Sequence, residues 1–184
     1  MIYFDSNSTS MLHPRVKDFV ISHLDLSGNP SSSHGFGRNV RSLIEKSRTY
    51  IADYLNRPRH QVIFTSSATE SNNWVLKNFP GPVFISAAEH ASSRAARPDA
   101  KVIPVKSNGL VDLDALELPD CLCLLSIMHA NNETGVLQDI TAIKNILSKN
   151  VLWHCDVVQS FGKLPIPDAD FLTFSGHKIG GLPG

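Results

Sequence analysis

The sequence predicts an α/β fold in three layers, with helices on both faces of a mostly parallel sheet. Short apolar runs without polar alternation, such as Pro82–Ser86 and Cys121–Ile127, are typical of strands buried on both faces. These runs alternate with segments whose apolar residues recur at helical spacing, which is the order of right-handed β-α-β units. With 184 residues, the chain has enough material for one sizeable domain with a real core.

The N-terminal third is predicted to be mostly helical. Ile2–Asp5 reads as a short strand, and Pro14 suits the first turn of a helix whose apolar stripe continues to Leu24. Residues 27–35 are rich in Ser, Gly, Asn and Pro and predict a loop. From Arg38 to Leu55 the apolar positions recur every three or four residues, so this range predicts a long amphipathic helix.

Beyond residue 60, predicted strands and helices alternate. No internal repeat, low-complexity tract or linker interrupts this order. The predicted strands are Gln61–Thr65, Pro82–Ser86, Lys101–Val105, Cys121–Ile127, Val151–Asp156 and Asp170–Phe174, and the predicted helices are Thr69–Asn78, Ala91–Ala96, Asp112–Leu118 and Asp139–Lys149.

Composition argues against several classes of protein. Seventeen basic and seventeen acidic residues cancel, so neither a nucleic acid nor a membrane is an expected partner. The N-terminus does not resemble a signal peptide, and no apolar run reaches membrane-spanning length. Three cysteines, an odd number, do not suggest a disulfide framework, so we expect a cytoplasmic protein with reduced thiols.

The cysteines and histidines do not predict a metal site. Cys121 and Cys123 alternate with leucines in one predicted strand, which favours small apolar packing over metal binding. Cys155 is expected to point away from its neighbour Asp156, and none of the three looks like an exposed nucleophile. The eight histidines lack HExxH spacing, and no nucleophile elbow, P-loop or GxGxxG turn is present.

Polar residues follow five of the predicted strands. In an open α/β sheet, ligands bind beyond the carboxyl ends of the strands. Each polar segment alone also fits an ordinary turn or helix cap, but their convergence on one edge favours a ligand site. The segments are residues 66–72, Glu89–His90, residues 129–133, Asp156 with Gln159, and Ser175–Lys178.

Lys178 lies in a loop bordered by glycines, Ser-Gly-His-Lys-Ile-Gly-Gly over residues 175–181. Glycine allows close approach of a ligand to the backbone, and a desolvated lysine loses its proton more readily. Lys178 is therefore a candidate Schiff-base nucleophile, with a solvated surface turn as the alternative interpretation.

Further residues of these segments have two interpretations each. Thr69 opens a helix whose free N–H groups favour a phosphate, although an ordinary N-terminal cap explains it as well. Asp156 ends an apolar strand, where it would pair with a cation such as the protonated nitrogen of a pyridine cofactor, or cap the next turn. His90 could stack on a flat ring, and Asn132 and Gln159 could donate to a phenolate-like oxygen. Local hydrogen bonding is the alternative for these three.

Together these motifs resemble the cysteine desulfurases, which are pyridoxal-phosphate enzymes of the class V aminotransferase group. The matching stretches occur in family order and span essentially the whole chain. They are residues 2–5, 29–34, 64–72, 89–90, 128–135, 156–160, 162–166 and 175–178.

The resemblance implies the large domain of a fold-type I pyridoxal-phosphate transferase, and it implies residue roles. Lys178 would hold the cofactor covalently and shuttle the Cα proton, and Asp156 would pair with the pyridinium nitrogen. His90 would stack on the ring and, with Lys178, would be catalytic. Phosphate and oxygen contacts would come from Ala68, Thr69, Asn132, Gln159, Ser175 and His177, and Asn7 would lie near the substrate.

The implied reaction converts L-cysteine to L-alanine and leaves sulfur as an enzyme-bound persulfide. A sulfur-acceptor or scaffold protein would receive it for iron–sulfur cluster assembly or tRNA thiolation. Residues 1–30 would be an N-terminal arm or small-domain segment, and 31–184 a large domain that is incomplete at its C-terminus, because family members are considerably longer. We therefore expect a homodimer or a complementing C-terminal half, and no complete turnover by this chain alone.

Two other functions fit the same residues. A selenocysteine lyase or another class V lyase would share these motifs, and a comparison of cysteine and selenocysteine turnover would separate them. The chain could instead be a non-catalytic remnant that binds an intact desulfurase. Binding that survives Lys178→Ala would favour that reading.

Overall fold

The computed structural model describes residues 2–183, which form two compact units. One unit is Leu12–Phe64, and the other joins the segment up to Met11 with the residues from Thr65 onward. The predicted boundary after residue 30 stays a prediction.

The unit Leu12–Phe64 consists of helices α1 (Pro14–Ile21) and α2 (Gly35–Leu55) and a 3-10 turn, η1 (Arg59–Gln61). Helix α2 begins three residues before the predicted start, because the His34 side chain accepts a hydrogen bond from the Gly37 amide at 3.4 Å. It ends at Leu55, and the next residue, Asn56, has a left-handed φ of 50°, which is common directly after a helix.

The prediction of a strand at Gln61–Thr65 is wrong, because no residue of this range pairs in a β-ladder. The Arg48 guanidinium, on α2, donates to the Val62 carbonyl, so a side chain takes the place that a neighbouring strand would fill.

The other unit is built on five strands that are all parallel, which confirms the predicted sheet. Their spatial order is β2-β1-β3-β4-β5, so the chain reverses direction across the sheet between β1 and β3. Strand β4 has the predicted bounds, and the other four are shorter than predicted by one to three residues. The strands are β1 (Val83–Ser86), β2 (Lys101–Ile103), β3 (Cys123–Ser126), β4 (Val151–Asp156) and β5 (Phe171–Thr173).

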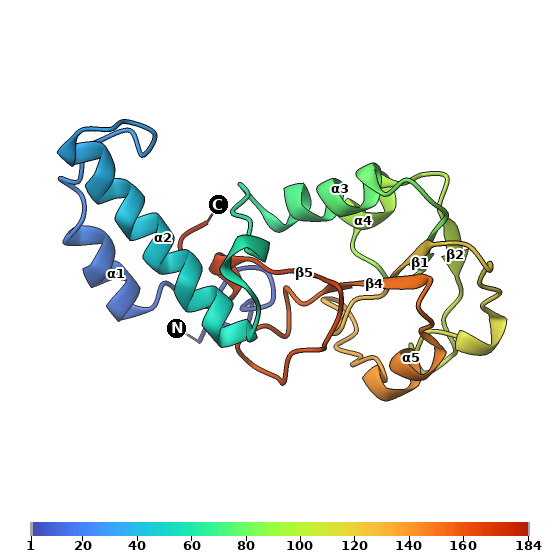
Figure 1. Cartoon of the computed structure of the whole chain (residues 1–184). Helices are drawn as coiled ribbons and strands as arrows, with labels where there is room; N and C mark the ends of the chain where they lie inside the picture. The colour runs from blue at the N-terminus through green and yellow to red at the C-terminus, as the bar shows by residue number, and fades with distance from the viewer. Residues whose placement is uncertain (1, 184) are drawn as a thin grey trace. The chain divides into compact units, whose positions relative to one another are not determined.

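Helices cover both faces of this sheet. Helices α3 (Ala68–Asn78) and α4 (Ala91–Ala96) lie on one side and α5 (Ile140–Ile146) lies on the other, which confirms the three-layer architecture (Figure 1). Leu76 of α3 and Ala96 of α4 pack with strand residues in one buried apolar cluster. Apolar burial of this kind is the main source of stability in such layers.

Arg97 closes the C-terminal end of α3. Its guanidinium donates to the carbonyls of Leu76 at 3.0 Å, Phe79 at 2.8 Å and Gly81 at 3.2 Å. Carbonyls at a helix end lack intrahelical partners, so these contacts fix where α3 stops.

Three smaller predictions are wrong. Ile2–Asp5 is not a strand, and Phe4 is 90% exposed. The predicted helix Asp112–Leu118 is only a 3-10 turn, η2 (Leu113–Ala115), because seven residues before a proline are too few and too constrained for a stable helix. Cys121 lies outside β3 and is exposed, whereas Cys123 is buried within it.

Two aromatic rings join the loops that follow β4 and β5. Phe161 and Phe174 stack with their ring centroids 3.9 Å apart and an angle of 3° between the planes. Stacking of this kind adds to the apolar burial of the two rings.

Candidate functional site

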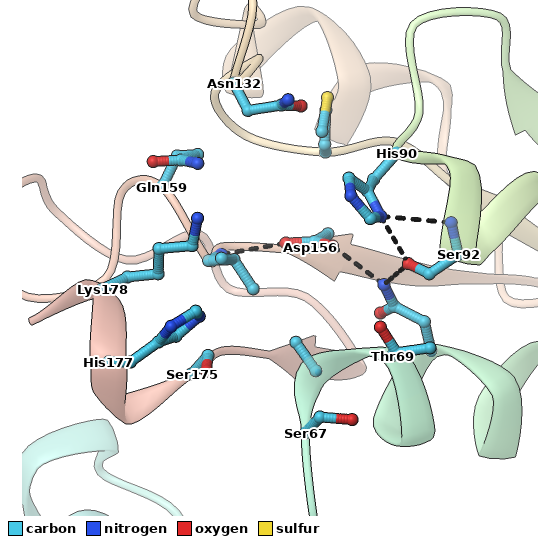
Figure 2. A pocket seen from close by; sticks show the side chains of 14 residues that line it. Ser67, Thr69, His90, Ser92, Asn132, Asp156, Gln159, Ser175, His177 and Lys178 are labelled. Carbon is cyan, nitrogen blue, oxygen red and sulfur yellow. Dashed lines mark hydrogen bonds between the residues drawn. The ribbon is translucent and has the colours of Figure 1, made fainter. Parts of the chain in front are cut away.

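A cavity of about 280 Å³ lies at the carboxyl ends of β1, β3, β4 and β5 (Figure 2). This position, next to the reversal between β1 and β3, is where open α/β sheets bind ligands. Every residue for which the sequence predicted a cofactor contact lines it, although the roles themselves remain predictions. These residues are Ala68, Thr69, His90, Asn132, Asp156, Gln159, Ser175, His177 and Lys178.

The buried lining residues of the cavity, which we call its buried side, are Asn72, Met128, Asp156 and Ser175, and Asp156 is the carboxylate among them. Asp156 is 6% exposed and accepts hydrogen bonds from Asn72 Nδ2 and from the Val158 amide, each at 2.9 Å. Burial nevertheless raises the pKa of Asp156. A cationic ligand atom beside this carboxylate would offset that cost of burial.

A second buried carboxyl, Glu89, lies near Asp156 but does not line the cavity. The Met128 amide donates to Glu89 Oε1, and Oε2 has no partner among the described residues. Burial, followed by the charge of Asp156, raises the pKa of Glu89 to about 8. Glu89 therefore holds its proton more tightly than an exposed carboxyl does.

The open side of the cavity, formed by the half-buried Asn132, Gln159 and Lys178, is held by one N-terminal residue. The Asn7 carbonyl accepts from Lys178 Nζ and, at 2.8 Å, from Gln159 Nε2. Asn7 Nδ2 donates to the Asn132 carbonyl at 3.1 Å. Asn7 thus bonds all three residues of the open side, although it does not line the cavity itself.

The lysine amine is placed in a partly dehydrated environment. Its Nζ also donates to the Ser8 carbonyl at 2.6 Å. Burial, and then the charge of Lys163, lower the pKa of Lys178, while Asp5 and Asp156 act in the opposite direction. A lysine that loses its proton more easily is a better nucleophile.

The backbone of the lysine loop is tightly constrained. Gly180 has a φ of 86°, and a Cβ on Gly181 would lie 2.8 Å from the Gly176 carbonyl oxygen. Ser10 adds contacts from the N-terminal segment, since its amide and hydroxyl donate to the His177 carbonyl at 2.9 and 2.7 Å. The loop therefore presents Lys178 at a fixed position.

The first turn of α3 combines both sequence interpretations. Ser67 Oγ accepts from the Glu70 amide at 3.2 Å, which is an ordinary helix cap. The amides of Ala68 and Thr69 have no acceptor among the residues that the structure describes. Because both residues line the cavity, two helix N–H groups remain for an anion.

Asn72 and Ser92 also line the cavity, but the sequence assigned a role to neither, although Asn72 ends the predicted polar segment 66–72. Asn72 follows Ala68 by four positions and Thr69 by three, so helical spacing could have placed it on the same face. Ser92 has no comparable signal, because its position depends on how α4 packs.

The cysteines lie away from the cavity. Cys121 is exposed, and Cys123 and Cys155 are buried, and none of them lines the cavity. Burial raises the pKa of both buried thiols, so neither is a thiolate at neutral pH. Within residues 2–183 there is no group of three or more His, Cys, Asp and Glu side chains that could hold a metal ion.

The family model for class V aminotransferases matches residues 2–184, and the chain belongs to this family. Class V aminotransferases and cysteine desulfurases are pyridoxal-phosphate enzymes. Among curated proteins, the chain is 36% identical to the cysteine desulfurase IscS of Rickettsia prowazekii (strain Madrid E), covering all of this chain and 50% of that protein. It is 37% identical to the mitochondrial cysteine desulfurase of Candida albicans, covering all of this chain and 42% of that protein.

Solved structures agree with this assignment. A NifS-like protein from Rickettsia africae ESF-5 has a TM-score of 0.91 and 46% identity, over 98% of this chain and 55% of that one. A protein described as SspA in complex with cysteine has a TM-score of 0.85 and 27% identity, over 100% of this chain and 59% of that one. The chain spans about half the length of the curated relatives it matches.

The residues of the cavity fit pyridoxal phosphate. Free amides at the start of α3 suit its phosphate, and the buried carboxylate of Asp156 suits its ring nitrogen. Lys178 offers an amine in the same cavity. The two amides, the carboxylate and the amine therefore match three different parts of the cofactor of the family.

Proposed function

We propose that this chain forms the cofactor-binding part of a pyridoxal-phosphate-dependent cysteine desulfurase. The observation that carries the proposal is a single cavity that contains a buried carboxylate, a lysine amine and two unpaired helix amides. When bound, the cofactor supplies an electron sink for charge that develops at the substrate Cα.

The chain's own residues would divide this task between binding and proton movement. Ala68 and Thr69 amides would hold the phosphate, and Asp156 would hold the ring nitrogen in its protonated form. Lys178 Nζ would bind the cofactor and later move a proton, and its lowered pKa favours both roles. His90 would cover one face of the ring.

L-Cysteine is the proposed substrate, because the desulfurase relatives are named for cysteine and one structural neighbour is described in complex with cysteine. The sulfur-accepting thiol would come from outside these residues, because no cysteine of the chain lines the cavity. The part of the relatives' length that this chain does not span, or a complementing polypeptide that corresponds to it, would supply the thiol, and a sulfur-acceptor protein would follow.

A cytoplasmic location is part of the same proposal. The three cysteines are unpaired, which suits a reducing compartment. Among the described helices, none is both long and apolar enough to cross a membrane.

Titration of the purified 184-residue chain with pyridoxal phosphate tests the proposal. We expect a visible absorption band and, after borohydride reduction, a cofactor adduct that peptide mass spectrometry locates on Lys178. Lys178→Ala should lose both signals, whereas Lys149→Ala should keep them, because Lys149 precedes the amino end of β4 and the cavity lies at the carboxyl end. Cofactor attached at another lysine, or no binding at all, would contradict the proposed site.

Product analysis tests the assignment of the thiol. With L-cysteine and cofactor, the chain alone should release little alanine. Robust alanine release by the purified chain would refute the proposal that the acceptor thiol comes from elsewhere. Faster turnover of selenocysteine than of cysteine, in a restored complex, would favour a selenocysteine lyase instead.

A further inference from the structure

A chain of hydrogen bonds links Asp156 to His90 through two side chains, Asn72 and Ser92, to which the sequence assigned no role. Asn72 is 1% exposed, and its Nδ2 donates to Asp156 Oδ2 at 2.9 Å and to Ser92 Oγ at 3.1 Å. Ser92 Oγ lies 2.8 Å from His90 Nδ1. Figure 2 shows Asp156, Ser92 and His90 in one part of the cavity, with dashed lines that mark these hydrogen bonds.

The backbone gives these hydrogen bonds a direction. The Ser92 amide donates to His90 Nδ1 at 3.1 Å, and an amide N–H can only donate. Nδ1 is therefore the acceptor, and neutral His90 carries its proton on Nε2. The Ser92 hydroxyl receives a hydrogen bond from Asn72, which leaves its own hydrogen to donate to Nδ1.

The orientation of Asn72 agrees with this direction. Its Oδ1 is buried without a partner among the described residues. The reverse orientation would point this oxygen at the Asp156 carboxylate, where two acceptors would face each other. The Asp156 carboxylate therefore fixes the orientation of the Asn72 amide. The amide fixes the direction in which the Ser92 hydroxyl donates, and the hydroxyl supports Nδ1 as the acceptor nitrogen of His90.

We propose that Asn72 and Ser92 are positioning residues that connect the carboxylate at Asp156 to the imidazole of His90 and keep Nε2 as its proton-bearing atom. The importance of this link for the cofactor rests on the proposed function, but the link itself exists in the protein without cofactor. It follows that a change of charge at Asp156 alters the hydrogen bonding of His90.

Long-range ¹H–¹⁵N correlation spectra of the cofactor-free chain test the link directly, with the His90 signals identified by His90→Gln. In the native chain, Nδ1 should be the unprotonated nitrogen and Nε2 the protonated one. Asp156→Asn should shift the His90 Nδ1 frequency in the native background and leave it unchanged in a Ser92→Ala background. If Asp156→Asn does not fold, Asn72→Ala is compared in the same two backgrounds.

Cofactor affinity provides a second readout. Ser92→Ala removes one hydrogen bond of the chain and should weaken binding of pyridoxal phosphate by about three- to tenfold. Ser92→Thr keeps the hydroxyl and should restore most of the loss. Asn73→Ala is the control on α3. The Asn73 side-chain Nδ2 donates to the Thr69 carbonyl of its own helix at 2.7 Å, so this side chain does not belong to the link between Asp156 and His90.

The two proposals fail in different ways. A native His90 with its proton on Nδ1, or a Nδ1 frequency that ignores both Asp156→Asn and Asn72→Ala, would overturn the inference even if the cofactor binds. A linked His90 in a chain that does not bind pyridoxal phosphate would support the inference and contradict the proposed function.

Discussion

The buried and open sides of the cavity hold their polar groups by different means. On the buried side, Asp156 is fixed by Asn72 on a helix and by the Val158 amide directly after its own strand. On the open side, Lys178 and Gln159 both bond the carbonyl of Asn7, which belongs to a segment without regular structure. The sheet and its helices thus fix the buried carboxylate, while a short N-terminal segment holds the lysine and the glutamine.

Because their polar groups are held by different means, the two sides should respond differently to pH and to substitution. Groups on the buried side, or directly behind it, cannot exchange protein contacts for water, so their ionisation is coupled to folding. Groups on the open side can rehydrate when a contact is lost, so their substitution should have small effects.

The largest expected effect concerns Glu89, behind the buried side. Its pKa is raised from 4.5 to about 8 in the folded chain, so the folded state binds the proton more tightly and stability falls as pH rises from 4.5 to 8. Glu89→Gln should abolish this fall and raise the free energy of unfolding at pH 9 by about 2–5 kcal/mol. Urea unfolding between pH 5 and 9 measures it. Glu133→Gln, at an exposed carboxyl, should leave the pH slope unchanged. An unaltered slope in Glu89→Gln would mean that Glu89 is already ionised.

The next effect concerns His154, on the same face of β4 as Asp156. Here stability rises with pH, whereas Glu89 makes it fall. Its ring is fully buried between Ser126 Oγ at 2.9 Å and Thr173 Oγ1 at 3.1 Å, and burial lowers its pKa from 6.5 to about 4. Stability from this group is present above pH 6.5 and is lost as pH falls toward 4, by about 3 kcal/mol.

His154→Gln should therefore show a smaller loss of stability between pH 6.5 and 4 than the native chain, whatever its stability at neutral pH. Thermal unfolding across this range is the measurement. His60→Gln, at an exposed histidine, is the control. An identical acid slope in His154→Gln and the native chain would contradict the prediction.

Asp156 itself should separate binding from stability. Asp156→Asn keeps the shape of the side chain but removes the charge that would pair with the cofactor ring, so affinity for pyridoxal phosphate should fall about 100-fold. Burial raises the pKa of Asp156, so removal of its charge offsets part of the cost of placing an NH2 group against Asn72 Nδ2 or the Val158 amide, and the free energy of unfolding at pH 8 should change by less than about 2 kcal/mol. Absorption titration and urea unfolding test the two halves. Asp99→Asn, at an exposed carboxylate paired with Arg97, should leave affinity unchanged.

The smallest effect is expected on the open side. Asn7→Ala removes one exposed hydrogen bond, to the Asn132 carbonyl, but keeps the Asn7 carbonyl that Lys178 and Gln159 share. Affinity for pyridoxal phosphate should change by less than about threefold. A loss as large as that of Asp156→Asn would remove the distinction between the two sides.

The sheet and most of the cavity could be predicted because their signals are local. The apolar run before Asp156 defines β4 to the residue, and the polar segments after four strands reach the cavity because parallel strands bring their ends together. Segments whose structure depends on distant partners were misread. Val62–Thr65 has the composition of a strand but finds no neighbouring strand.

The same dependence on distant partners explains why the sequence assigned no role to some residues at or near the site. Asn72 and Ser92 look like ordinary polar residues of two helices until packing brings α3 against α4. Glu89 was noted only as a neighbour of His90, and its raised pKa depends on burial that no sequence pattern shows.

The stacked rings of Phe161 and Phe174 have a consequence for the short edge strand β5. One ring follows the segment that carries Asp156 and Gln159, and the other immediately precedes the lysine loop. Local opening of β5 must separate the rings, and it would release both segments from the ligand together. A bound ligand therefore opposes that opening by mass action, and amide hydrogen exchange in β5 should slow as ligand concentration rises. Hydrogen exchange at the edge of the sheet should thus report how much of the cavity is occupied by ligand.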